Sequence, residues 1–204
     1  SYRELSVPGE LMGFSARWGA VVETPEEQSL LSAEEFAAQY GENASYGRYV
    51  HQNTQRRLLL WNMESGDYTV VADHNKDGYL MTVDPMQIYG MEHIYQCGDE
   101  LRLLNLDSGE SRTLLSMEDI INYWVMDSKA FIITDTEAGS RVWVADLQDG
   151  KPVELVGAAD EHGMVMSPSQ EGGSFFRALG DNGRCVISKE DFYAVRFKNA
   201  VDVG

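Results

Sequence analysis

The chain has 204 residues, with 16 Lys and Arg against 33 Asp and Glu, and a formal net charge of −17. Nucleic acids and anionic membranes bind proteins through clustered positive charge, so this composition argues against both kinds of partner. Hydrophobic residues make up 43% of the chain, which is enough for a sizeable core. No apolar run approaches the roughly 18 residues of a transmembrane segment.

The N-terminal part predicts strands followed by a helix. Residues 10–23 read as one or two strands, with Phe14 and Trp18 as expected core residues. The Ser-Ala-Glu-Glu sequence that begins at Ser32 is a capping box, in which the serine and the second glutamate each bond the backbone of the other. It predicts one short helix over 33–40.

Three later segments share one form, which is an apolar strand, a polar turn that ends in glycine, and a second strand. They cover 58–71, 101–115 and 142–156, and their closing glycines are 43 and 41 residues apart. A weaker fourth copy predicts strands at 184–188 and 193–197. The Ser-Gly and Asp-Gly pairs supply the positive φ that tight hairpin turns need.

Further strand candidates lie upstream of each hairpin, at 46–52, 87–95, 123–134 and 164–178. Up to four short strands in each period of about 42 residues is typical of a β-propeller blade. The pattern resembles the degenerate β-propeller repeats of bacterial extracytoplasmic proteins. This resemblance implies an all-β fold with about four blade-like units over 44–204, and residues 1–43 as a partial blade or a cap. A β-sandwich of consecutive hairpins is the alternative.

One motif in the sequence points to chemistry. Residues 73–84 fit the spacing of a calcium-binding loop. The candidate ligands are Asp73, Asn75, Asp77, the carbonyl of Tyr79, and Asp84. Calcium takes six to eight oxygen ligands, and this spacing wraps them round one point. The segment resembles the loops of EF-hands and dockerins, which implies calcium as a structural cofactor.

The motif departs from those loops in two respects. Its last ligand is Asp84 rather than glutamate, and the shorter side chain weakens the site or favours the smaller magnesium ion. The flanks at 68–71 and 79–83 read as strands rather than helices. A plain hairpin loop is the alternative, because Asn-Lys-Asp-Gly is a good turn by itself.

The cysteines and histidines carry no further motif. Cys97 and Cys185 have no metal-type spacing, and they are either one disulfide of an exported protein or two buried thiols. The four histidines show no paired ligand spacing, and no Gly-rich phosphate loop is present. A zinc enzyme or a nucleotide-dependent enzyme is therefore disfavoured.

Together these features predict a non-enzymatic binding or interaction module of extracytoplasmic type, secreted or a lipoprotein, and stabilised by calcium. It would contact a protein or glycan ligand through its loops. Two alternatives stay open. One is a carbohydrate-active hydrolase that uses paired carboxylates, and the other is a structural segment of a larger propeller protein. A cytoplasmic location also stays open, and the sequence does not specify the oligomeric state.

Overall fold

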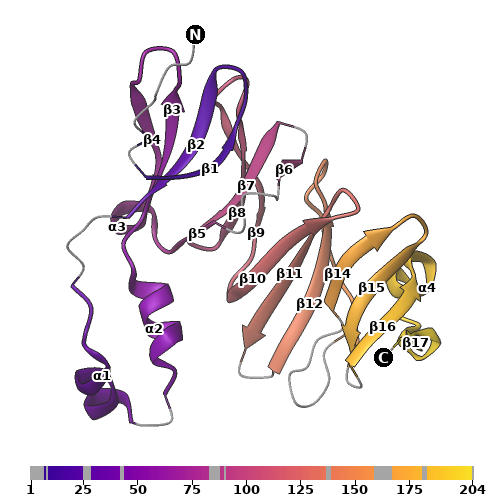
Figure 1. Cartoon of the computed structure of the whole chain (residues 1–204). Coiled ribbons are helices and arrows are strands. Elements are labelled where there is room, and N and C mark those ends of the chain that lie inside the picture. The colour runs from indigo at the N-terminus through magenta and orange to yellow at the C-terminus, as the bar shows by residue number, and fades with distance from the viewer. Residues whose placement is uncertain are drawn as a thin grey trace. The chain divides into compact units, whose positions relative to one another are not determined.

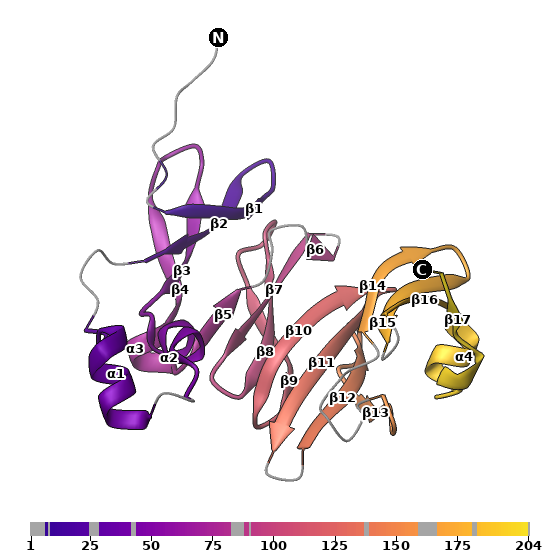
Figure 2. The same cartoon turned by 60° about the horizontal axis from the view of Figure 1, so that its bottom comes forward.

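The computed structural model describes residues 7, 9–24, 29–41, 44–82, 88–89, 91–136, 139–158, 167–180 and 183–203. It divides into two compact units, Ser1–Thr113 and Leu114–Gly204. Most of the described residues form β-strands, as predicted (Figures 1 and 2). Among them, no helix is long and apolar enough to cross a membrane.

The described strands form four antiparallel sheets, each of which is a meander in chain order (Figure 1). The first contains β1 (Glu10–Phe14), β2 (Trp18–Glu23), β3 (Arg57–Asn62) and β4 (Tyr68–Asp73). The second contains β5 (Leu80–Thr82), β7 (Glu92–Cys97), β8 (Glu100–Asn105) and β9 (Ser111–Ser116), and β6 (Ile88–Tyr89) pairs with β7. The third contains β10 (Ile120–Met126), β11 (Lys129–Thr136), β12 (Gly139–Asp146) and β13 (Pro152–Glu154). The fourth contains β14 (Ser167–Gly172), β15 (Phe175–Gly180), β16 (Gly183–Ser188) and β17 (Val201–Asp202).

A four-stranded meander is the unit of a propeller blade, so the fold is propeller-like and all-β in its framework. The described strands do not form the alternative, a sandwich of consecutive hairpins. The first 43 residues supply β1 and β2, and β2 pairs with β3, so all four strands join one sheet.

The first sheet is buried on both faces. Ala20, Val22 and Leu60 lie in a core shared with the second sheet, while Val21 and Leu59 pack in a separate cluster on the opposite face. All five are at most 6% exposed. Burial on both faces explains why β2 and β3 read as continuous apolar runs instead of alternating ones.

The expectation for Phe14 is wrong, because β1 contains a bulge. The register of β1 against β2 shifts between Leu11 and Gly13. The shift turns Met12 into the core at 5% exposure and leaves Phe14 64% exposed. Trp18, the other expected core residue, is partly buried and packs against the core.

The predicted N-terminal helix is confirmed as α1 (Ala33–Tyr40). Its capping box is formed as expected. The Glu35 N–H donates to Ser32 Oγ at 3.2 Å, and the Ser32 N–H donates to Glu35 Oε2 at 2.8 Å. These two bonds satisfy N–H groups that the first turn of a helix leaves without partners.

The strand predicted at 46–52 is wrong, because this segment forms a second helix, α2 (Tyr46–Asn53). Tyr46 and Tyr49 are one helical turn apart, and both rings pack on Phe36 of α1, at centroid distances of 5.5 and 4.9 Å. Their hydroxyls also bond the Leu31 backbone at 3.0 and 2.9 Å. The aromatic spacing suits a helix as well as a strand, and this packing decides between them. Both helices lie in the segment between β2 and β3 (Figure 2).

The turns of the three predicted hairpins share one hydrogen-bond pattern. They follow β3, β8 and β12, and their key residues are Asn62 and Gly66, Asn105 and Gly109, and Asp146 and Gly150. In each turn the last strand residue accepts the N–H two residues later on its side-chain oxygen, at 2.8–2.9 Å. Its carbonyl accepts the glycine N–H, again at 2.8–2.9 Å. The glycines have φ of 86°, 76° and 66°, which other residues rarely adopt.

The strand predicted at 193–197 is wrong. The chain instead forms α4 (Lys189–Tyr193) and a 3-10 helix, η1 (Phe197–Asn199), and β17 then pairs with β16. Ser188 caps α4, since its Oγ accepts the Asp191 N–H at 3.0 Å. Phe192 is fully buried and packs on Phe176. With α2 and α3 (His74–Asp77), α4 adds to the one helix that the sequence predicts.

A buried histidine lies in the second sheet. His93 on β7 is 1% exposed, and neither ring nitrogen has a hydrogen-bond partner among the described residues. This burial lowers the pKa of His93 from 6.5 to about 4. The folded chain therefore holds the neutral imidazole at a pH where the unfolded chain is already protonated.

Replacing His93 should flatten the pH dependence of stability. Between pH 6.5 and 4 the unfolded state binds more protons at His93 than the folded state does. The free energy of unfolding therefore decreases as the pH falls through this range, by up to about 3 kcal/mol from His93. Urea denaturation of the chain and of His93→Leu, at pH 7.5, 6 and 4.5, measures this. The two share every other titrating group, so parallel profiles would contradict the prediction.

Candidate functional site

The candidate calcium ligands Asp73, Asn75 and Asp77 lie close together, at the end of β4 and in α3 (His74–Asp77). The segment forms a helical turn rather than a plain hairpin loop. Asp73 caps it, since its Oδ1 accepts the Asn75 N–H at 3.0 Å. Asp77 Oδ2 accepts the Asp73 N–H at 2.8 Å. Both carboxylates thus bond the local backbone, Asp73 as the N-cap of α3 and Asp77 from the other end of the helical turn.

The other two candidate ligands lie further along. The carbonyl of Tyr79 accepts the Gly98 N–H at 2.8 Å, at the turn between β7 and β8. Asp84 lies outside the described residues. Among those residues, no three His, Cys, Asp or Glu side chains are grouped so that they could hold a metal ion. The calcium loop therefore stays a prediction.

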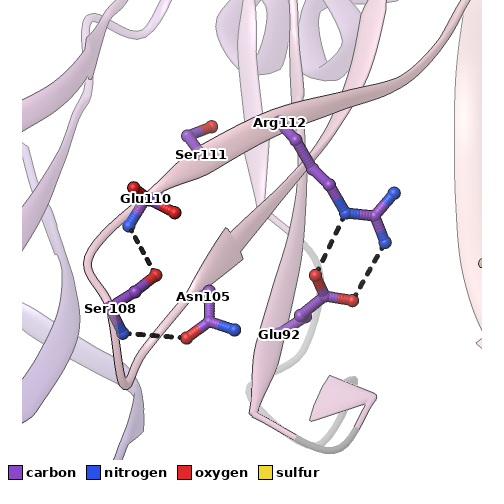
Figure 3. Close-up of a pocket in the computed structure, with 6 residues that line it drawn as sticks. All are labelled: Glu92, Asn105, Ser108, Glu110, Ser111 and Arg112. Atoms are coloured by element: carbon purple, nitrogen blue, oxygen red, sulfur yellow. Dashed lines mark hydrogen bonds and ion pairs between the residues drawn. The ribbon is translucent and has the colours of Figure 1, made fainter.

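A different site is a polar pocket in the first unit, with a cavity volume of about 420 Å³ (Figure 3). It lies where β7 begins, β8 ends and β9 begins. Its lining residues are Glu92, Asn105, Ser108, Glu110, Ser111 and Arg112.

A bidentate ion pair forms one wall of the pocket. Arg112 Nε and Nη2 donate to Glu92 Oε1 and Oε2, both at 3.1 Å (Figure 3). The two parallel bonds hold the guanidinium and carboxylate planes in one orientation. The side chains are 44% and 21% exposed, so the pair adds little stability and mainly provides geometry.

The turn between β8 and β9 forms the opposite wall. Asn105 Oδ1 accepts the N–H groups of Asp107 and Ser108 at 2.8 and 2.9 Å, which fixes the orientation of its amide. Ser108 Oγ accepts the Glu110 N–H at 3.2 Å. Within the described part of the chain, the Asn105 Nδ2 group and the Glu110 carboxylate make no hydrogen bond. The wall therefore combines two ordered side chains, Asn105 and Ser108, with one spare donor group, the Asn105 amide, and one spare acceptor group, the Glu110 carboxylate.

A hydrogen bond to a core residue holds Ser111 in place. Its Oγ lies 2.7 Å from the hydroxyl of Tyr95, a residue that is fully buried. Burial raises the pKa of Tyr95, so the phenol stays protonated at neutral pH. This bond ties the start of β9 to the core beside the pocket.

The sequence does not predict this pocket. Glu92 and Arg112 are far apart in the chain, and only the order β7, β8, β9 in the sheet brings them together. Asn105 and Ser108 belong to a turn that recurs in three sheets, so the sequence indicates a structural role for them and not a binding site. The one usable signal is that the turn after β8 ends in Glu110, an exposed carboxylate beside the basic Arg112.

No family model matches the chain, and no curated protein does. Solved structures match it in fold. An oligogalacturonate lyase in complex with manganese aligns with a TM-score of 0.51 and 14% identity, over 86% of this chain and 48% of that chain. This chain thus spans about half the length of the lyase.

Two further matches are more distant. TolB from Acinetobacter baumannii aligns with a TM-score of 0.39 and 10% identity, over 88% of this chain and 40% of that chain. The β-propeller domain of the Trilobed protease from Pyrococcus furiosus aligns with a TM-score of 0.34 and 11% identity, over 91% of this chain and 55% of that chain. All three neighbours are β-propeller proteins, and the likeness to the lyase shows a propeller-like fold for this chain.

A calcium titration tests the predicted loop. If the Kd is about 0.1 mM, then 10 mM calcium raises the free energy of unfolding by about 2.7 kcal/mol. Asp73→Asn keeps the helix cap but removes the carboxylate, so the variant should fold and lose this gain. Thermal melts with calcium, magnesium or chelator measure it. An unchanged Tm, or an equal rise in the variant, would contradict the loop.

Proposed function

We propose that the chain is a binding module of extracytoplasmic type, and that the pocket of its second sheet holds a neutral, hydroxyl-rich ligand such as a glycan. The spare hydrogen-bonding groups of Asn105 and Glu110 carry this proposal. Each sugar hydroxyl both donates and accepts, so an amide donor near a carboxylate acceptor suits it. The serine hydroxyls of the pocket extend the same polar lining.

The charges of the pocket favour a neutral ligand. Glu92 and Glu110 against Arg112 make the lining net negative, and the chain as a whole carries −17. An anionic ligand would meet repulsion both inside and outside the pocket. A neutral glycan meets none, and it gains from directional hydrogen bonds.

The rigidity of the pocket also supports binding. Arg112 holds Glu92 through two bonds, and the turn holds Asn105 through two more. Side chains that are ordered before the ligand arrives lose little conformational entropy on binding.

A hydrolase is the second candidate, because Glu92 and Glu110 place two carboxylates in one pocket. A glycosidase needs one carboxyl group as proton donor to the leaving oxygen. Both oxygens of Glu92 accept bonds from Arg112, so only Glu110 of the two is free to act, whereas a glycosidase also needs a second carboxylate as nucleophile or base. This geometry supports binding over hydrolysis.

The extracytoplasmic assignment does not depend on a disulfide. Cys97 and Cys185 are both buried thiols that are not joined in a disulfide. Burial raises the pKa of each thiol, which makes both unreactive. The proposal instead draws on the resemblance of the repeat to extracytoplasmic propeller proteins.

A glycan array followed by calorimetry tests the proposed function. Asn105→Asp keeps the turn acceptor but removes the amide donor, and Glu110→Gln removes the carboxylate. Each should weaken binding at least tenfold, about 1.4 kcal/mol, because the first variant loses a hydrogen-bond donor and the second loses a charged acceptor. Asn62→Asp is the matched control, since it makes the same change in the equivalent turn of the first sheet and should bind normally.

Two outcomes would overturn the proposal. One is the absence of any bound glycan on the array at millimolar sensitivity. The other is hydrolysis of chromogenic glycosides by the chain, lost in Glu110→Gln, which would establish the hydrolase instead.

A further inference from the structure

The fourth sheet has one buried face and one exposed face. Phe176 and Ile187 point into a core that the sheet shares with the third sheet. On the opposite face, the register places Arg177, Val186 and Val201 side by side on the neighbouring strands β15, β16 and β17 (Figure 1). We call this opposite side the outer face of the fourth sheet.

The apolar residues of this outer face are open to solvent. Phe175, Val201 and Val203 are between 52% and 63% exposed, and Val186 is half-buried. Val203 continues the pairing of β17, since its N–H donates to the Arg184 carbonyl at 3.0 Å. Single exposed apolar side chains are common on protein surfaces, whereas a group of them on adjacent strands marks an interaction surface.

The charges of this outer face are positive. On β15, β16 and β17 the charged residues that share it are Arg177 and Arg184, and both are exposed. The chain as a whole carries a net charge of −17. An apolar face with two arginines is complementary to a surface that is apolar and acidic.

The first sheet has a surface of that complementary kind. Val21, Leu59 and Trp61 form a buried cluster on the side that does not pack on the second sheet, which we call the outer face of the first sheet. The register of β1, β2, β3 and β4 places four further apolar residues on this face, and they are between 37% and 64% exposed. They are Leu11, Phe14, Tyr68 and Val70.

The first sheet is also acidic. Residues 10–23 and 57–73, which hold its strands and turns, contain five Asp and Glu against two Arg. Glu64 and Asp67 are exposed in the turn that leads to Tyr68. The two outer faces are therefore complementary in charge, and each has apolar area for the other to cover.

We propose that two copies of the chain associate head to tail, with the outer face of the fourth sheet of one copy on the outer face of the first sheet of the other. The contact buries the exposed apolar residues of both faces and brings the arginines toward the acidic turn. A second copy is the occupant because the chain itself carries both complementary faces. Contact between two identical faces would instead bring like charges together.

The size of the faces sets the expected affinity. A face of four short strands covers about 20 Å by 20 Å. This is small for a specific interface, so we expect association at about 10 μM of the chain and not at nanomolar concentration.

Sedimentation velocity of the full chain, over about 1 to 300 μM, tests the proposal. We expect a monomer at the lowest concentration and a complex of two chains at the highest. Tyr68→Arg sets a positive charge against the arginines of the other copy, and Val201→Asp sets a negative charge against its acidic turn. Both change exposed side chains, so both variants should fold, and each alone should associate at least tenfold more weakly.

An equimolar mixture of the two variants provides the sharpest test. The Tyr68→Arg chain keeps its fourth-sheet face, and the Val201→Asp chain keeps its first-sheet face. The mixture should therefore regain the complex of two chains that neither variant forms alone. Tyr40→Arg and Val156→Asp are the matched controls, since they make the same changes at exposed positions outside both faces and should associate normally.

Three results would overturn the proposal. A monomer at every concentration would mean that a surface other than a second copy covers these faces. Normal association of either variant alone would indicate contact between identical faces or elsewhere. A mixture that stays monomeric would exclude the head-to-tail contact. Neither face includes a residue of the pocket in Figure 3, so this proposal and glycan binding can fail separately.

Discussion

The structure depends on one repeated interaction, in which the side chain that ends the third strand of a sheet accepts hydrogen bonds from the turn that follows. Asn62, Asn105 and Asp146 each make this bond, and a glycine with positive φ completes each turn. The turn reverses the chain within five residues and lays the fourth strand beside the third. Without it the first three sheets would lack their outer strands.

A second cavity, of about 470 Å³, lies on the equivalent turn of the third sheet and differs in chemistry from the pocket of Figure 3. In the second sheet the turn presents Ser108 and Glu110, and in the third sheet the same two places hold Asp149 and Lys151. Glu110 and Lys151 thus occupy equivalent positions of the two turns and carry opposite charges. The backbone of the turn is thus architectural, and its exposed side chains make one cavity polar and acidic and give the other a balanced set of aspartates and lysines.

Three sequence predictions failed for identifiable reasons. In 46–52 the aromatic residues suit either periodicity, and packing of Tyr49 on Phe36 selected the helix. In 193–197 the residues have high β propensity, but the cap at Ser188 and the burial of Phe192 set a helix just before them. The bulge in β1 that exposes Phe14 has one local signal, Gly13, because an isolated glycine within a strand often marks a bulge.

The sequence by itself determined the β-rich framework, the capped helix α1 and the three glycine turns, because each follows from residues within about ten positions. Tertiary structure alone decided the sites. Glu92 meets Arg112 only because β7, β8 and β9 are neighbours, and Tyr193 meets Lys129 only because α4 packs near the start of β11. Long-range pairing is set by the burial of whole faces and strand order, which no short stretch of sequence encodes.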